Sequence, residues 1–197
     1  MSRDGTHNFY PGLKMPKETY VPCLLQLFRQ YGYDGATLSK ISQATGLGKA
    51  SLYHHFPGGK NEMVKAVLDY LEQWSEENLL STLRGEGDAE SRLRRMCDRL
   101  NQLYQGGQQP CVFVILLSGS ARDVFHDQVK GLFVTWIDAI AQVLIEAGMD
   151  EKLAQERGED AAIAIQGGLI LSQGLDNPSA FQRVIQQLPK QLCNLDK

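Results

Sequence analysis

Apolar residues recur every three or four positions along most of the chain, which is the spacing of an amphipathic α-helix. The clearest case is residues 122–147, whose apolar side chains fall on one side of a helix that Gly148 would end. The chain offers no clear strand candidate and no internal repeat. We therefore predict an all-α fold of roughly nine helices.

The first helix is predicted to end before Gly32, a residue typical of helix C-termini. Pro22 is tolerated only in the first turn of this helix, and a longer helix that began at Lys17 would be kinked there. The apolar stripe that this helix would bury comprises Leu24, Leu27, Phe28 and Tyr31.

Further helices are predicted between glycine and proline breaks. Residues 60–83 indicate one long helix, and Asp88 is a candidate N-cap for the next. Residues 111–117 are apolar all round and predict a short buried helix, with a strand as the weaker alternative. Residues 160–172 predict a helix that is apolar on two sides. Pro189 is expected to kink or end the regular part of the last helix.

Residues 37–56 read as two short helices joined by a tight turn. Ile41 lies on the inner face of the first, and Leu52 and Phe56 lie one turn apart on the second. Gly46 can take the positive φ that such a turn needs. The pattern describes a helix-turn-helix, although an αα-hairpin in an ordinary helical domain fits the periodicity equally well.

The same stretch resembles the DNA-binding motif of TetR-family transcriptional repressors. The resemblance lies in residues 36–47 and 51–56, and residues 57–63 are similar to that family's entry into its fourth helix. The linker has one residue more than the commoner version, as in the subgroup related to the repressor LmrA. The resemblance implies a helix-turn-helix head on a helical body that binds ligand and dimerises.

The resemblance and side-chain chemistry together assign contacts to a double-stranded DNA operator. Helix N-termini hold phosphate, which suits Thr37 and Lys60, and a lysine at the start of the recognition helix can donate to guanine. His55 and Phe56 are expected to pack inward. The predicted DNA-binding residues are Thr37, Lys40, Lys49, Ala50, Ser51, Tyr53, His54 and Lys60.

The distribution of charge agrees with a DNA-binding head. Residues 1–60 hold seven Lys and Arg against three acids, a net charge of +4, whereas the remainder carries −7 and the whole chain −3. We place the head in residues 1–60 and the helical body in residues 61–197. Residues 1–16 are expected to form an arm without regular structure, from which Arg3 and Lys14 could touch DNA.

The last two helices are predicted to form the interface of a homodimer. A helix on a monomer surface needs one apolar side, and the helix over residues 160–172 has two. Residues 165–171 and 176–178 also resemble the C-terminal region of the LmrA-like subgroup. The alternative is a core helix in a three-layer monomer. The predicted interface residues are Ala162, Ile163, Ile165, Gly167, Leu169, Ile170, Phe181, Val184, Ile185 and Leu188.

A pocket for a small, mostly apolar effector is predicted among the stripes that face one another in the body. Trp136 is expected at its edge, because a large ring with an N–H often borders a cavity, and Gln166 needs a polar partner in an apolar helix. The predicted lining is Met96, Leu100, Phe113, Leu117, Phe133, Trp136 and Gln166.

Other functions are less well supported by the sequence. No phosphate-binding loop, nucleophile elbow or metal-ligand cluster is present, so we predict neither an enzyme nor a cofactor. The longest apolar run is too short to span a membrane, and the N-terminus lacks the apolar core of a signal peptide, which predicts a cytoplasmic protein. A thiol-sensing regulator using Cys97 or Cys111 stays open, Cys97 more so because Arg94, Arg95 and Arg99 lie near it in sequence. An architectural protein that uses its helices only for association is the remaining alternative.

Overall fold

The computed structural model describes residues 16–194, which form helices and no β-strand. This confirms the all-α prediction. Most of the predicted N-terminal arm, with Arg3 and Lys14, lies outside the described residues. The α-helices are α1 (Val21–Gly35), α2 (Leu38–Thr45), α3 (Lys49–His55), α4 (Gly59–Ser75), α5 (Ser81–Leu83), α6 (Ala89–Leu103), α7 (Val112–Leu116), α8 (Arg122–Glu146), α9 (Glu151–Gly174) and α10 (Ser179–Cys193).

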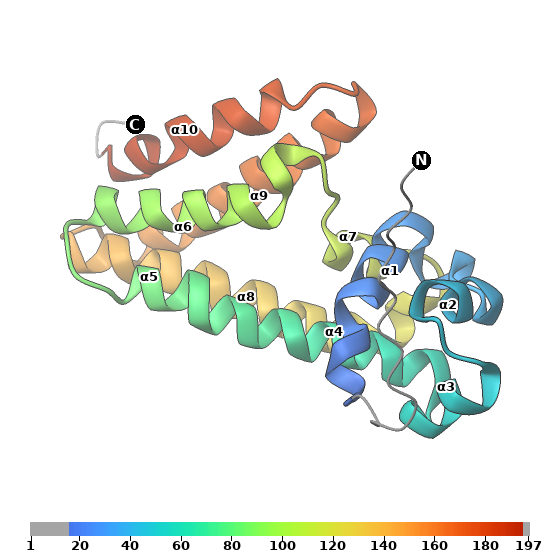
Figure 1. Ribbon diagram of the computed structural model, residues 1–197. Helices are drawn as coiled ribbons and strands as arrows, with labels where there is room; N and C mark the ends of the chain where they lie inside the picture. Colours follow the sequence, from blue (N-terminus) through green and yellow to red (C-terminus); the bar gives the residue numbers. More distant parts are fainter. Residues whose placement is uncertain (1–15, 195–197) are drawn as a thin grey trace, which may run out of the picture.

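Helices α1, α2 and α3 gather into a small head at one end of the molecule (Figure 1). α4 starts in this head and runs into a larger helical body. In the body, α9 packs against α8 on one side and α10 on the other, and α10 in turn packs on α6. Since α1 also packs on α4 and α7, the head meets the body along several helices.

The apolar side chains form two clusters, and α4 contributes to the first of them over most of its length. Met63, Val67 and Leu71 pack with α1, α2 and α3 in the head cluster, which also takes in the start of α8 through Phe125. The body cluster begins further along with Leu79. The predicted domain boundary after residue 60 therefore stays a prediction. The apolar side chains change from the head cluster to the body cluster further along, within the long helix that begins with α4.

The long helix predicted over residues 60–83 is interrupted by a π-helical turn at Glu76–Leu80. A π turn inserts one extra residue and rotates the apolar stripe that follows it. Here the stripe turns from the head cluster, ending at Leu71, to the body cluster, starting at Leu79. Counting α4, this turn and α5 as one continuous helix gives nine helices in residues 16–194.

Most helix ends follow the sequence signals. Pro22 lies in the first turn of α1, and the Asp88 carboxylate caps α6 by accepting the Ser91 N–H at 2.8 Å. Two details were wrong. Tyr31, expected in the core, is 39% exposed. α9 begins at Glu151 rather than near residue 160, because Asp150 caps it and its first two turns are too polar to show an apolar stripe.

The head is also tied to the body by polar contacts at the start of α8. The Asp34 carboxylate at the end of α1 accepts hydrogen bonds from the N–H and the hydroxyl of Ser120. These hydrogen bonds lower the pKa of Asp34, because they stabilise its charged form. The contact fixes the C-terminal end of α1 against the loop before α8.

By length and composition alone, Gly119–Glu146 could cross a membrane. Core helices pass the same test, and this one packs on α9 and α6 within the body. It approaches α9 closely at Gly158, where an added Cβ would lie 2.8 Å from the carbonyl oxygen of Ile137. The two longest helices of the body can therefore pack this tightly only because residue 158 has no side chain.

Replacing Gly158 by alanine should destabilise the fold. The clash with a backbone carbonyl costs about 1–3 kcal/mol, which outweighs the gain in helix propensity of about 1 kcal/mol. We expect a lower melting temperature by circular dichroism at fixed protein concentration. Gly131→Ala in α8 is the matched control, because its Cβ would meet nothing within 4 Å, and it should be neutral or stabilising. Equal melting temperatures for the two variants would contradict the close contact.

Candidate nucleic-acid interface and internal cavity

Helices α2 and α3 form the predicted helix-turn-helix. Thr37 caps α2 by accepting the Lys40 N–H at 3.3 Å, and Gly46 follows α2 with a φ of 70°. Ile41 and Leu52 are buried between the two helices and α1. The geometry therefore confirms the tight turn and the inner faces expected from the sequence.

The turn between α2 and α3 is held by side chains as well as by its glycine. The Ser42 hydroxyl donates to the Leu47 carbonyl, and the Leu47 N–H donates to the Thr45 hydroxyl at 3.3 Å. These two bonds pair the backbone carbonyl and N–H of Leu47, a turn residue, with side chains of α2. They fix the angle at which α3 leaves the turn.

The outer face of α3 is exposed. It exposes a lysine, small residues and larger polar rings close to the N-terminal end, the end that reaches base edges in helix-turn-helix proteins. Phe56 is fully buried and His55 is half-buried, with its ring 5.2 Å from that of Tyr20, so both face inward as predicted. The exposed residues are Lys49, Ala50, Ser51, Tyr53 and His54.

Two of the predicted phosphate-binding lysines rest on tyrosine rings. The Lys40 ammonium lies 3.8 Å from the centre of the Tyr31 ring, and the Lys60 ammonium lies 4.1 Å from that of Tyr33. Lys60 also donates to the Tyr33 carbonyl at 2.8 Å. Such cation–π contacts orient the two ammonium groups beside the helix-turn-helix. The sequence reading missed these tyrosine partners.

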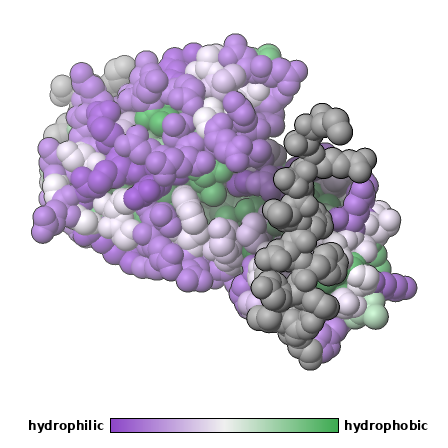
Figure 2. Space-filling view, viewed as in Figure 1, coloured by the Kyte–Doolittle hydropathy of each residue, from purple (hydrophilic) through white to green (hydrophobic). Residues whose placement is uncertain are grey.

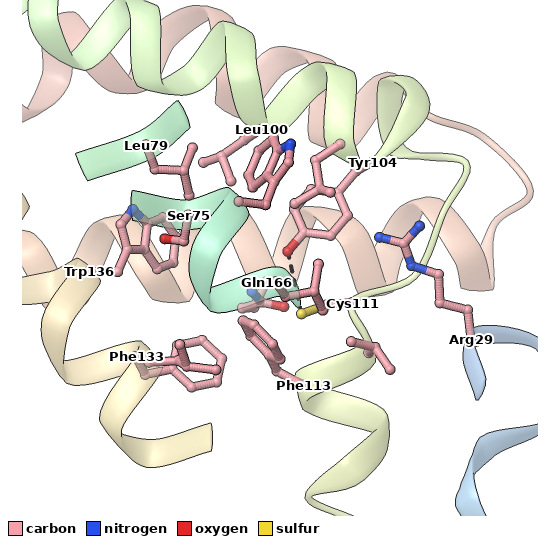
Figure 3. A pocket seen from close by; sticks show the side chains of 15 residues that line it. Arg29, Ser75, Leu79, Leu100, Tyr104, Cys111, Phe113, Phe133, Trp136 and Gln166 are labelled. Carbon is pink, nitrogen blue, oxygen red and sulfur yellow. Dashed lines mark hydrogen bonds between the residues drawn. The ribbon is translucent and has the colours of Figure 1, made fainter. Parts of the chain in front are cut away.

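An internal cavity lies in the body next to the head, bordered by α1, α4, α6, α7, α8 and α9 (Figure 3). It offers about 40 Å³ to the centres of water-sized molecules, which is room for a few waters. In Figure 2, hydrophobic atoms are visible in a hollow between α4 and α6, beside the head. The lining residues are Arg29, Leu71, Trp74, Ser75, Leu79, Leu100, Leu103, Tyr104, Cys111, Val112, Phe113, Leu132, Phe133, Trp136 and Gln166.

Five of the seven residues predicted to line a pocket border this cavity. They are Leu100, Phe113, Phe133, Trp136 and Gln166. The other two, Met96 and Leu117, do not border it. Met96 is completely buried, and its sulfur accepts the indole N–H of Trp136 at 3.2 Å, so it backs the wall. Leu117 packs on the head cluster, because α7 ends before it.

The cavity also contains polar groups without partners. The Oε1 atom of Gln166 is buried and accepts no hydrogen bond. The Nε atom of Arg29 is buried and donates none, and this side chain reaches the cavity from α1 of the head. Burial lowers the pKa of Arg29. Sequence reasoning missed Arg29, although its position directly after Phe28 in the apolar stripe of α1 was a signal.

Tyr104 and Cys111 bring polar groups to the cavity from the end of α6 and the start of α7. The Tyr104 hydroxyl donates to the Cys111 sulfur at 3.4 Å, shown dashed in Figure 3. Burial raises the pKa of Tyr104 well above its usual value, so it stays a neutral donor. Cys111 also lies in the field of Arg29, a basic neighbour that its local sequence does not reveal.

Cys97 does not have the environment expected of a reactive thiol. Burial and the nearby Asp98 raise its pKa to about 12, and the opposing effect of Arg94 is smaller. A thiol with this pKa is almost wholly protonated at neutral pH, whereas the thiolate is the reactive form. Arg94, Arg95 and Arg99, which are near Cys97 in sequence, therefore do not lower the pKa of its thiol enough to make it reactive.

A second surface feature is an apolar face on α9. Ile163 is 69% exposed, and Ile170, Leu171 and Leu175 are more than half exposed. A Cβ added at Gly167 would meet nothing within 4 Å, so the backbone is open there. The two apolar sides predicted for this helix are both present, one in the core and one on the surface.

The predicted interface residues divide between these two sides of α9 and the corresponding sides of α10. Ile163 and Ile170 are exposed, and Gly167 and Val184 are half-buried. The other six pack within the chain's own core and are at most 8% exposed: Ala162, Ile165, Leu169, Phe181, Ile185 and Leu188. Their part in an interface stays a prediction. Within residues 16–194, no group of three or more His, Cys, Asp or Glu could hold a metal ion.

Known proteins match both parts of the chain. Residues 24–67 match the family of bacterial regulatory proteins called tetR, and residues 89–187 match the C-terminal domain of LmrA/YxaF-like transcriptional regulators. The chain is 22% identical over 181 residues to the HTH-type transcriptional regulator LmrA of Bacillus subtilis, covering 88% of this chain and 94% of LmrA.

Solved structures of TetR regulators share the fold. A regulator from Legionella pneumophila has a TM-score of 0.79 at 18% identity, covering 91% of this chain and 98% of its own. The regulator CifR, solved as a cysteine mutant with 26-base-pair operator DNA, has a TM-score of 0.74 at 15% identity, covering 91% and 98%. The helix-turn-helix and the helical body agree with the family matches. The chain belongs to the TetR family of bacterial transcriptional regulators and has a C-terminal domain of the LmrA/YxaF-like type.

Proposed function

We propose that this regulator is a repressor that binds a palindromic operator as a homodimer and leaves it when a small molecule occupies the cavity. The observation that carries the proposal is the path of α4, which starts beside the helix-turn-helix and continues through the π turn along the cavity. Membership of the TetR family makes the protein a transcriptional regulator and not an enzyme. Since operator DNA lies in the bacterial cytoplasm, we infer that location.

Operator binding is assigned to the exposed face of α3 and the helix ends beside it. Lys49, Ala50 and Ser51 are free at the N-terminal end of α3 to meet base edges. Tyr53 and His54 suit the groove wall or phosphates. Their exposure on a helix whose opposite face is buried supports this assignment.

Phosphate contacts are assigned to Thr37, Lys40 and Lys60, which flank α3. Thr37 and Lys40 lie at the N-terminal end of α2 and Lys60 at that of α4, where free backbone N–H groups and the positive end of the helix dipole favour phosphate. CifR, the relative solved with operator DNA, shares this fold. Contacts to phosphate fix the register of the recognition helix and carry no sequence information themselves.

A homodimer is supported by the exposed apolar face of α9. Ile163, Ile170 and Leu175 would each leave most of their side chain in water in a monomer. Gly167 and Gly174 leave the backbone open along the same helix, which permits a close approach of a second helix. Two heads are also needed to read half-sites one DNA turn apart.

Control by an effector is supported by the size and position of the cavity. At about 40 Å³ for the centres of water-sized molecules, the cavity is too small for most organic molecules without movement of its walls. α4 forms one wall through Leu71, Trp74 and Ser75. An effector that displaces α4 would favour a head position that no longer fits the operator.

The thiol-sensing alternative is less well supported. The high pKa of Cys97 removes the candidate that the sequence favoured. Cys111 is buried and lies on the cavity wall, where an effector would contact it. We therefore assign Cys111 to the lining of the effector site.

Substitutions in the head should separate affinity from specificity. Lys60→Ala should weaken binding to every sequence and lower the salt slope by about one, as for a lost phosphate contact. Lys49→Ala should reduce discrimination between operator and mismatched DNA by roughly 1–3 kcal/mol. Fluorescence anisotropy at several salt concentrations measures both. Lys152→Ala on α9 removes the same charge far from the head and should change neither quantity.

A charge on the exposed face of α9 should disrupt the dimer. Ile170→Asp would bury a carboxylate against apolar groups, and we expect self-association to weaken by roughly tenfold or more. Val124→Asp, also at an exposed apolar site, is the control and should leave association unchanged. Sedimentation at micromolar concentration measures the mass. A wild-type protein that sediments as a single chain would disprove the interface.

Changes in the cavity should alter the effector response and spare DNA binding. Trp136→Phe and Gln166→Met keep much of the side-chain volume while changing the shape and polarity of the wall. We expect operator affinity within roughly threefold of wild type and a shift of roughly tenfold in the effector concentration needed for release, across a panel of small aromatic compounds. Gln142→Met, at an exposed position of α8, is the control. Unchanged responses in both cavity variants would place the effector site elsewhere.

A further inference from the structure

Arg29 brings an unpaired positive charge to the wall of the cavity. Its side chain is 7% exposed, and within residues 16–194 it makes no hydrogen bond or ion pair. Figure 3 shows its guanidinium directed from α1 toward Tyr104. Of the described residues that line the cavity, Arg29 alone carries a charge.

A buried guanidinium without a counter-ion is unfavourable. Arginine keeps its proton at every physiological pH, so it cannot escape burial by becoming neutral. Buried charges in proteins are therefore normally paired. The neighbours that interact with Arg29 electrostatically are Tyr104, Cys111 and Tyr70, none of them a carboxylate. The missing partner is an anion.

We propose that the cavity takes a small molecule with one carboxylate on an apolar, aromatic body, and that Arg29 binds the carboxylate. This inference rests on the proposed function in that it takes the cavity to be the effector site. A planar guanidinium matches a carboxylate through two parallel hydrogen bonds. The single charge at the site fits a monoanion better than a phosphate with two charges.

The remaining lining residues fit the rest of such a molecule. Rings of Trp74, Phe113, Phe133 and Trp136 surround the apolar part of the cavity. The buried Oε1 of Gln166 offers an acceptor without a partner, which a hydroxyl or N–H on the ligand would satisfy. Recognition would thus combine one charged anchor, one polar anchor and aromatic contact.

Because Arg29 belongs to the DNA-binding head, a ligand bound to Arg29 would contact the head directly. Arg29 belongs to α1, which packs on α4 and, through the head cluster, on α2 and α3. A carboxylate bound to Arg29 touches the head itself, while its apolar body lies against α4 and α8. Binding would therefore act on both helices that connect the head to the cavity.

The test uses the full-length protein and simple aromatic carboxylates as probes. Benzoate, phenylacetate and phenylpropionate are each compared with their neutral amides. The chain has two tryptophans, Trp74 and Trp136, and both line the cavity, so selective tryptophan fluorescence reports its occupation. We expect at least one carboxylate to bind roughly tenfold or more tightly than its amide.

Arg29→Met removes the charge and keeps an apolar stem of similar length. It should bind carboxylate and amide within roughly threefold of each other, while Arg29→Lys should retain part of the preference. Arg99→Met, at an exposed site on α6 outside the cavity, is the matched control and should behave as wild type. Without ligand, Arg29→Met should melt no lower than this control, because it loses only an unpaired charge.

Four results would overturn the proposal. They are equal binding of acids and amides by wild type, no tryptophan response to any carboxylate, an unchanged preference in Arg29→Met, and a much lower melting temperature of that variant, which would mean that the chain itself pairs Arg29. Carboxylate binding without release of operator DNA would support the site and contradict the effector part of the proposed function. The wild-type comparison of acids with amides holds even if a variant fails to fold.

Discussion

The structure depends on one continuous helix that belongs to two hydrophobic clusters. Residues of α4 up to Leu71 pack in the head cluster, and the continuation of the same helix contributes Leu79 and Leu80 of the π turn and Leu83 of α5 to the body cluster. Close-packed clusters transmit displacement because they contain little free volume. A shift of α4 on one side of the π turn must therefore be taken up by the head or by the body. The π turn lies beside the cavity, where Ser75 and Leu79 form its wall.

The second element that joins head to cavity is α1, through Arg29. Leaving a buried charge without its partner costs about 3–5 kcal/mol, a large fraction of the stability of an ordinary domain. This unfavourable free energy is present in the unliganded protein and is relieved when an anion pairs with the charge. This difference in free energy between the empty and the occupied cavity is what a ligand needs in order to shift the position of the head. The fold thus supplies a mechanical connection through α4 and an electrostatic one through α1.

The sequence was sufficient for features that depend on neighbouring residues. The helix-turn-helix follows from Thr37, Gly46, Leu52 and Phe56, whose roles are set within twenty residues of chain. The two apolar sides of α9 were also visible as periodicity. What periodicity could not decide was which side faces the chain's own core, so Ile165 and Leu169 were assigned to the interface together with Ile163 and Ile170. That choice depends on where α8 and α10 pack, which is not a local property.

The cavity shows the same limit of prediction from local sequence. Leu100, Phe113 and Trp136, which were chosen from facing stripes, do border the cavity, because apolar residues of the body pack toward one another. Arg29 and Cys111 meet only through the packing of α1 on α7, across more than eighty residues of sequence. The apparent arginine cluster around Cys97 was misleading for the converse reason, since residues close in sequence on a helix point to different sides. Burial, more than the neighbouring arginines, sets the pKa of the Cys97 thiol.

The most direct test of the account is reciprocal linkage between the cavity and the DNA. If occupation of the cavity weakens operator binding by a given factor, operator binding must weaken occupation of the cavity by the same factor. The measurement is the Kd of phenylacetate, by tryptophan fluorescence, for the free protein and for the protein saturated with the palindrome from its own promoter. The account predicts weaker binding in the DNA complex, by the factor found for DNA release. Equal Kd values in the two states would contradict it, because the cavity and the head would then be independent.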